Sequence, residues 1–350
     1  MKLKSTQNVR SYTDAQTQID DSKILQEELP QGGQGEVQEL HNGQPASRYT
    51  ALVPCFHPIE AHKKLGGEIK FLPARLVSDI PLTLACGQCT GCRLERSRQW
   101  AVRMVHESKM HKKNCFLTLT YDDAHLPESR SLDVTHWQKF ARRVRKKVGP
   151  FRFYHCGEYG EKNGRMHLHA AVFGQDFSAD RKQQSITDQG HRLYSSAQLS
   201  TLWPNGLSVI GDLTFESCAY VARYVTKKIT GERALDHYTT HVDIDTGEVH
   251  SLKPPYATMS RNPGIGATWL KKFHTDVYPA DEVISNGHPA RPPKFYDNQL
   301  EKNRPELFAA IKRQRKKQGE KHSSNNTPDR LRVRESVMEA RTSALKRSLE

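Results

Sequence analysis

The stretch that decides the fold consists of two short runs, FRFYHCGE (151–158) and MHLHAAVF (166–173), separated by seven residues. Both runs are rich in aromatic or apolar residues and have the length of a β-strand. The connection between them holds two glycines and an asparagine, which favour a turn: Gly160, Asn163 and Gly164. The sequence therefore predicts an antiparallel hairpin.

The second strand of this hairpin carries a pair of candidate metal ligands. His167 and His169 lie two apart, so both imidazoles project from the same face of the strand. Simple pairing around the turn sets Glu158 opposite His167, with Cβ atoms about 5 Å apart. Two imidazoles and a carboxylate suit Mg²⁺ or Mn²⁺ acting as a Lewis acid on a phosphodiester. Glu161 is the alternative third ligand, and an isolated histidine pair is also common on ordinary protein surfaces.

A second candidate group lies in ESCAYVARYVTKKIT (216–230), which predicts a helix. Tyr220 and Tyr224 are four apart, hence on one helical face and about 6 Å from each other. Lys227 follows on the same stripe and Lys228 lies at its edge. A phenol is protonated at neutral pH, so a nearby ammonium and a metal-polarised phosphate would help it to attack phosphorus. Tyrosines at this spacing are also common as a packed aromatic pair.

Covalent attack by tyrosine would have a useful consequence. A phosphotyrosine retains the energy of the broken phosphodiester, so a strand could be rejoined without ATP. The sequence contains no GxxxxGK[ST] phosphate-binding loop, which excludes an ATPase motor of that type. Two tyrosines on one face would allow one to hold an old DNA end while the other cuts again.

The remaining pattern alternates between helices and strands. CFLTLTY (115–121) predicts a strand with Thr118 and Thr120 on the side opposite its leucines. Helices are predicted over 97–113 and over 133–148, the latter with Asp133 or Thr135 as its N-cap, and another strand over 206–215. This order indicates the α+β class, with helices packed on a central antiparallel sheet.

Three cysteines form a CxxCxxC run, a spacing that suits thiolates around Zn²⁺: Cys86, Cys89 and Cys92. The first candidate for the fourth ligand is Cys55, and the alternatives are His57 and Cys115. The seven cysteines are odd in number and unevenly spaced, which favours a reduced compartment over a disulfide framework. Three free thiols or an iron–sulfur cluster are the competing interpretations.

Charge indicates the class of partner. The 350 residues carry a net charge of +14, which favours a polyanion such as DNA or RNA, although an anionic membrane surface would also fit. There is no run of eighteen apolar residues and no apolar signal region at the N-terminus, so we expect a soluble, unexported protein.

The composition is uneven along the chain. Residues 1–48 are polar and predicted to be disordered. Residues 49–114 form a Cys-rich region with a basic helix, and 115–300 hold the strands, histidines and tyrosines. Residues 301–350 contain fourteen Lys or Arg against seven acids, which predicts a basic tail, solvated or frayed, that either solubilises the chain or grips DNA.

Several of these stretches resemble one known superfamily. FLTLTY (116–121), GRMHLHAAVFG (164–174) and the tyrosine helix are similar to the three motifs of the HUH endonucleases. The double tyrosine resembles the replication initiators of small single-stranded DNA phages. Three further stretches resemble the gokushovirus-type Microviridae initiator: CGQCTGCRLERSRQWAVR, CGEYGEKNGRMHLH and MSRNPGIG. The resemblance covers roughly residues 51–300.

The resemblance implies an antiparallel palm that carries the histidine pair with the tyrosine helix beside it. It also implies a rolling-circle initiator, which nicks and rejoins single-stranded DNA at a phage origin through a 5′-phosphotyrosine. The free 3′-OH would serve a host polymerase, with a host helicase as a further partner, in the cytoplasm of the bacterial host.

Rival classes explain less of the sequence. A non-catalytic, zinc-dependent nucleic-acid-binding protein accounts for charge and cysteines but gives the histidines and tyrosines no joint purpose. A structural virion component accounts only for the basic tail. A relaxase would use the same chemistry, and the gokushovirus-like stretches argue against it.

Overall fold

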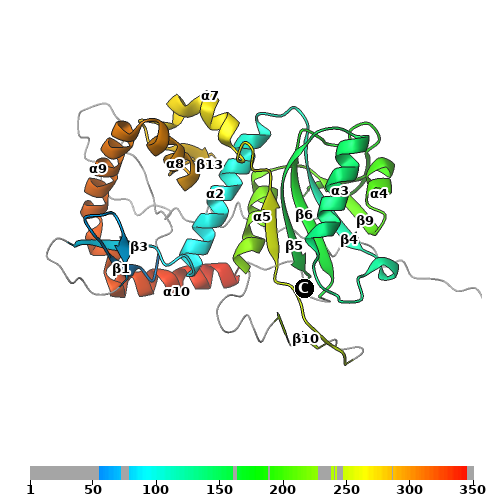
Figure 1. Cartoon of the computed structure of the whole chain (residues 1–350), viewed down its shortest axis with the longest axis horizontal. Coiled ribbons are helices and arrows are strands. Elements are labelled where there is room, and N and C mark those ends of the chain that lie inside the picture. Colours follow the sequence, from blue (N-terminus) through cyan, green and yellow to red (C-terminus); the bar gives the residue numbers. More distant parts are fainter. Residues whose placement is uncertain are drawn as a thin grey trace, which may run out of the picture.

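The computed structural model consists of a sheet-based part and a largely helical part, which meet along the long helix α2 (Thr90–Ser108) (Figure 1). The residues that the structure describes are 55–71, 79–160, 164–187, 190–227, 238–239, 241–242, 247–285 and 287–344. The segment 1–48, predicted to be disordered, lies outside them.

A seven-stranded antiparallel sheet forms the first part, in the order β12-β5-β6-β4-β9-β8-β7. The α+β class with a central antiparallel sheet is therefore confirmed. The strands are β4 (Asn114–Tyr121), β5 (Arg152–Tyr159), β6 (Met166–Phe173), β7 (Lys182–Ile186), β8 (Arg192–Ser195), β9 (Gly206–Gly211) and β12 (Tyr256–Met259).

The β5–β6 hairpin has the predicted register, with Glu158 opposite His167 and Cys156 opposite His169. The other edge of β6 pairs with β4, which sets Thr118 opposite His169 and Thr120 opposite His167. The histidine strand therefore lies in the interior of the sheet, between two long strands that limit its movement.

One face of the sheet packs against α3 (Val134–Lys147) and α4 (Ala197–Leu202). Leu168 of β6 lies in this core together with Trp137 and Phe140 of α3. The helix α3 begins where the Asp133 side chain accepts a hydrogen bond from the Thr135 backbone N–H at 2.8 Å, which confirms the predicted N-cap.

The opposite face packs against α2 and α5 (Phe215–Lys227). Ala101 and Met104 of α2 share a buried cluster with Cys218 and Ala222 of α5. The helix α2 begins seven residues earlier than the predicted helix 97–113, because the CxxCxxC run leads directly into its first turn rather than into a separate loop.

The loop MSRNPGIG joins the last strand of the sheet to the helical part. The buried carboxylate of Glu107 in α2 accepts hydrogen bonds from the Gly266 backbone N–H at 2.7 Å and from Arg152 of β5 at 2.5 Å. Arg152 also donates to the Pro263 carbonyl at 2.6 Å. This loop is therefore held by charge-assisted hydrogen bonds from both parts of the molecule.

The second part contains four helices: α7 (Ala267–Val277), α8 (Lys294–Asn303), α9 (Pro305–Lys321) and α10 (Pro328–Ala344). A three-stranded sheet adjoins them, made of β1 (Ile59–Lys63), β2 (Ile69–Lys70) and β3 (Ile80–Leu84). The remaining short pairs are β10 (His241–Val242) with β11 (Val249–His250) and β13 (Val283–Ser285) with β14 (His288–Ala290).

The C-terminal segment differs from the predicted solvated tail or frayed helix. Phe308 and Ile311 of α9 are buried in a cluster with α7 and α8, and Arg315 forms ion pairs with Asp281 and Asp297. Three residues separate Phe308 from Ile311, which sets both on one face of α9. The helix α10 then returns to pack against α2.

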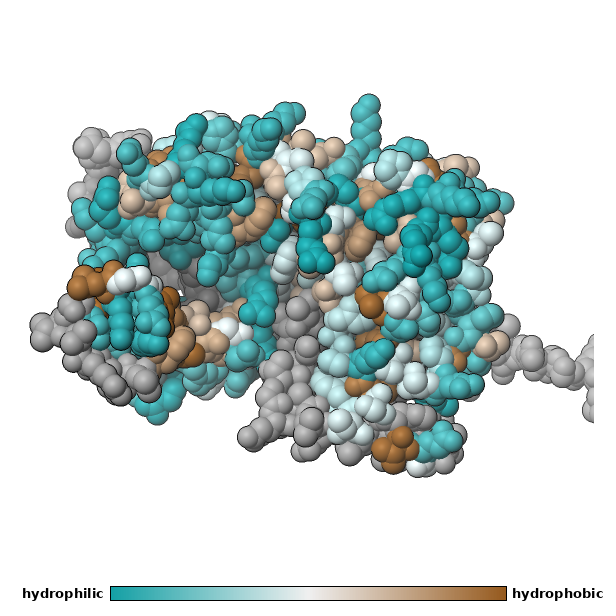
Figure 2. All heavy atoms as spheres, viewed as in Figure 1, coloured by the Kyte–Doolittle hydropathy of each residue, from teal (hydrophilic) through white to brown (hydrophobic). Residues whose placement is uncertain are grey.

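The surface on the face shown is mostly hydrophilic, and exposed apolar side chains lie mainly over β1–β3, among them Ile59, Ile69 and Ile80 (Figure 2). Among the helices of the described residues, none combines the length and apolar character that crossing a membrane requires.

Candidate active site

The candidate site lies on the face of the sheet that α5 covers. Residues alternate along β6, so that Leu168 and Ala170 enter the α3 core while Ala171 and Phe173 face α5. His167 and His169 share the α5 side by the same alternation. Glu158 and His169 are buried, with 4% and 3% of their surface exposed, so a charge at this place is poorly solvated.

Two threonines of β4 orient the histidines. The Thr118 and Thr120 hydroxyls lie 3.1 Å from Nδ1 of His169 and of His167, respectively. Where each hydroxyl accepts the Nδ1 hydrogen, Nε2 of the same ring presents a lone pair, as a metal-binding imidazole must. The sequence placed both threonines on one side of a strand without assigning them a role. Their alternation with leucines beside a His-x-His strand is the signal that could have identified them.

The carboxylate of Glu158 meets Nε2 of His169 rather than that of its cross-strand partner. Its Oε1 lies 2.8 Å from His169 Nε2. The ring of His167 is centred 6.1 Å from that of His169, and its Nε2 lies against Gly160, 3.0 Å from where a Cβ on that glycine would be. A buried carboxylate beside the Nε2 atoms of two imidazoles is a donor set that fits a divalent cation.

Burial favours the metal-binding form of His167. The surrounding protein, followed by the charges of His169 and Arg165, lowers the pKa of His167 to about 3. The ring is therefore neutral at physiological pH, which is the state in which imidazole binds a metal.

The helix α5 brings Tyr220 to this cluster. The helix begins with reciprocal hydrogen bonds, in which the Thr214 N–H donates to the Ser217 hydroxyl and the Ser217 N–H donates to the Thr214 hydroxyl. Further along the helix, the Tyr220 ring lies 5.2 Å from the His169 ring with the planes perpendicular. Tyr220 is 7% exposed, so its ring is largely enclosed beside the candidate ligands.

The other predicted residues of this helix are placed less fully. Tyr224 and Lys227 belong to α5, and Tyr224 follows Tyr220 by about one turn. Lys228 and the alternative ligand Glu161 lie outside the described residues.

The helix α2 supports α5 from behind. The Ser97 hydroxyl donates to the Ala219 carbonyl at 3.2 Å, directly before Tyr220 in the chain. Trp100, which follows Ser97 by about one turn of α2, packs on Tyr154 with ring centroids 4.9 Å apart. The position of the tyrosine helix therefore depends on α2.

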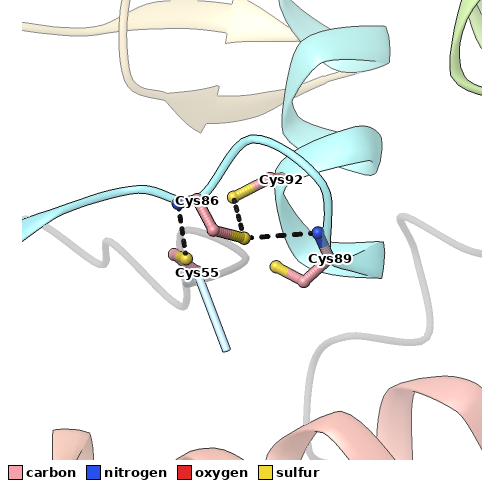
Figure 3. Close-up of side chains that lie close together, drawn as sticks. All are labelled: Cys55, Cys86, Cys89 and Cys92. Carbon is pink, nitrogen blue, oxygen red and sulfur yellow. Dashed lines mark hydrogen bonds between the residues drawn. The ribbon is translucent and has the colours of Figure 1, made fainter. Parts of the chain in front are cut away.

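The four cysteines predicted as zinc ligands lie together at the start of α2 (Figure 3). Their Sγ atoms all lie within 4.8 Å of one another, so this group could hold a metal. The two alternatives for the fourth ligand have other partners: His57 bonds to Glu335 at 2.9 Å, and the buried Cys115 thiol donates to the Gln175 carbonyl at 3.4 Å.

The thiols of this group differ in acidity. Burial opposes ionisation of Cys86, but hydrogen bonds from the backbone N–H groups of Cys89 and Gln88 outweigh it and lower the pKa of Cys86 to about 6. Burial raises the pKa of Cys92 and of Cys55.

The fold and site define a class. The family model for replication-associated protein ORF2 matches residues 114–229, the segment that runs from β4 to the end of α5 and contains every candidate ligand of the sheet. Curated relatives make the assignment narrower. Replication-associated protein VP4 of Bdellovibrio phage phiMH2K is 31% identical over 266 residues, which is 73% of this chain and 79% of the relative.

Two further relatives come from viruses of other bacteria. Replication-associated protein ORF2 of Spiroplasma virus 4 is 28% identical over 71% of this chain and 80% of its own length. Replication-associated protein ORF4 of Chlamydia phage 1 is 28% identical over 65% of this chain and 55% of its own length. The chain therefore belongs to the replication-associated proteins of gokushovirus-type microviruses. No solved structure matches the chain.

Proposed function

We propose that this protein initiates rolling-circle replication by cutting and rejoining single-stranded DNA at a phage origin. The observation that carries the proposal is the contact of Tyr220 with His169, whose Nε2 in turn meets Glu158. A phenol thus lies beside a buried cluster suited to a divalent cation. The relatives are named as replication-associated proteins of phages, which supports the biological role.

In this proposal Glu158, His167 and His169 would hold Mg²⁺ or Mn²⁺, and Thr118 and Thr120 keep the imidazoles oriented. When bound, the ion supplies Lewis-acid polarisation of the scissile phosphate. The Tyr220 oxygen attacks phosphorus, so a Tyr–O–P bond forms while the bond from phosphorus to the 3′ oxygen breaks. The phenol loses its proton, and the released 3′ oxygen gains one.

The reverse reaction reseals DNA. A 3′-OH attacks the phosphotyrosine, restores the phosphodiester and returns a proton to the phenol, with no need for ATP. Tyr224 acts in the proposal as a second nucleophile, so that one tyrosine holds an end while the other cuts. Lys227 and Lys228 supply positive charge that favours the phenolate and binds phosphate. The 3′-OH serves a host polymerase and helicase in the bacterial cytoplasm.

The test uses labelled single-stranded DNA from the cognate origin, incubated with the full chain and Mn²⁺ or Mg²⁺. We expect a protein–DNA adduct that survives SDS, and we expect His167→Ala to abolish it. The matched control is His288→Ala, which removes an exposed histidine of β14 in the helical part. DNA binding without any adduct from the unaltered chain on a verified origin would contradict the proposal and favour the non-catalytic binding protein.

A further inference from the structure

The four cysteines join segments that are separate in the chain. Cys55 precedes β1, Cys86 follows β3, and Cys89 and Cys92 belong to the N-cap and first turn of α2. The small sheet thus leaves and re-enters the same point (Figure 3). None of the four takes part in a disulfide.

Their spacing fits one tetrahedral ion. The Sγ atoms of Cys86 and Cys92 are 4.0 Å apart, and all four sulfurs lie within 4.8 Å of one another. Zinc–sulfur bonds of about 2.3 Å in a tetrahedron set the sulfurs roughly 3.8 Å apart, so little movement is needed to enclose the ion.

Backbone N–H groups point at these sulfurs. The Cys86 N–H donates to Cys55 Sγ at 3.1 Å, the Cys89 N–H to Cys86 Sγ at 3.3 Å, and the Phe56 N–H to Cys89 Sγ at 3.4 Å. Such donors stabilise negative sulfur, as the outer hydrogen bonds of a metal site do. Cysteines that only fill a core, such as Cys218, need no such set of donors.

We propose that Cys55, Cys86, Cys89 and Cys92 bind one structural zinc ion, which anchors the start of α2 and thereby holds the tyrosine helix α5 in place. Four thiolates select a soft or borderline metal, whereas the imidazole–carboxylate cluster of the sheet accepts harder ions. With all four positions filled by sulfur, the zinc has no open position for substrate.

The mechanical path from this ion to the site is short. Ser97 hydrogen-bonds to Ala219 of α5 about two turns after Cys89, and Ala101 and Met104 pack on the same helix. The ion also lies beside the attachment of α10, since His57, two residues after Cys55, pairs with Glu335 at 2.8 Å. Loss of the ion should therefore loosen both α2 and α10.

The first experiment measures metal content in the full chain, which requires no DNA cleavage. After dialysis against EDTA, we expect about one zinc per chain to remain, and Co²⁺ substitution to give the visible spectrum of a tetrathiolate site. Cys86→Ser and Cys92→Ser should lose the ion, whereas Cys115→Ser and His57→Ala should keep it. Iron with inorganic sulfide in place of zinc, no retained metal, or loss of zinc in Cys115→Ser would overturn the proposal.

The second experiment tests the coupling without depending on how a variant folds. A mercurial reagent releases zinc from the intact chain, and a chromogenic chelator measures the release. We expect α10 to become sensitive to protease and adduct formation to fall, with both recovered when the reagent is removed by excess thiol and zinc is restored. Unchanged protease sensitivity after complete release would overturn the anchoring role.

The adduct readout alone rests on the proposed nicking activity. His167→Ala should retain the zinc while forming no adduct. A chain that holds zinc but never forms an adduct would contradict the nicking proposal and leave the zinc site supported.

Discussion

The sheet cluster (Glu158, His167 and His169) and the cysteine cluster (Cys55, Cys86, Cys89 and Cys92) hold their side chains by different means. The first projects from neighbouring strands of one sheet, and threonine hydroxyls limit the rotation of its rings. The second is gathered from loop segments and the start of a helix. Strands give a rigid platform that can leave one side of an ion open, whereas gathered loops are suited to enclosing it.

The difference separates two purposes. The sheet cluster adjoins Tyr220, which could react with a bound phosphate, while the cysteine cluster adjoins only structural elements. A change to the first should alter reactivity with the fold retained, and a change to the second should alter the fold first. The following predictions test that separation, from the largest expected effect to the smallest.

The largest effect is expected for His169→Ala. This change removes the Nε2 that meets Glu158 and the ring against which Tyr220 packs. We expect adduct formation to fall by at least about 10³-fold, because both the donor set and the position of the nucleophile are lost. Gel analysis of SDS-resistant adducts measures the change. Retained zinc in the same variant would confirm that the two clusters are independent, and loss of both activity and zinc would contradict it.

The tyrosines come next. Tyr220→Phe and Tyr224→Phe should each leave one cut possible, whereas the double variant should form no adduct, because no phenol oxygen remains in this helix face. Mapping the labelled peptide after nuclease digestion identifies which tyrosine carries the DNA. If each single variant loses all cleavage, alternation between two nucleophiles is wrong even if nicking stands.

An intermediate effect is expected for Thr118→Val, which keeps the shape of the side chain but removes the hydroxyl beside His169 Nδ1. We expect the Mn²⁺ concentration needed for half-maximal adduct formation to rise by about 10- to 100-fold, as is usual when a ligand's outer partner is lost. Thr118→Ser restores the hydroxyl and should recover the affinity. An unchanged Mn²⁺ requirement in the valine variant would show that the hydrogen bond has no orienting role.

The smallest effect is expected for Gly160→Ala. The added methyl would lie 3.0 Å from His167 Nε2, so the ring must shift by a few tenths of an ångström. We expect the rate of adduct formation to fall by about 10-fold with little change in thermal stability, because geometry at a reacting centre is more sensitive than packing at a turn. Gly319→Ala, which meets nothing within 4 Å, is the matched control. An effect of the same size in the control would remove the steric explanation.

The local parts of the candidate site could be predicted well from sequence. The hairpin register, with Glu158 opposite His167, follows from strand alternation and a short turn. The diagonal contact between Glu158 and His169 could not be predicted in the same way, because it depends on side-chain rotation set by Thr118 in a strand about fifty residues away. The packed helices α9 and α10 were missed because their charged surface hides a narrow apolar contact around Phe308 and Ile311.

By itself, the sequence determined which side chains share a face: the histidines of β6 through the two-residue period of a strand, and Tyr220 with Tyr224 through the turn of a helix. It also determined that three cysteines lie within one helical start. Only the tertiary structure decided that α5 lies over β6, that Thr118 and Thr120 face the histidines, and that Cys55 completes the cysteine cluster. These contacts join distant segments, and they form because many buried side chains pack together at once, which no local period encodes.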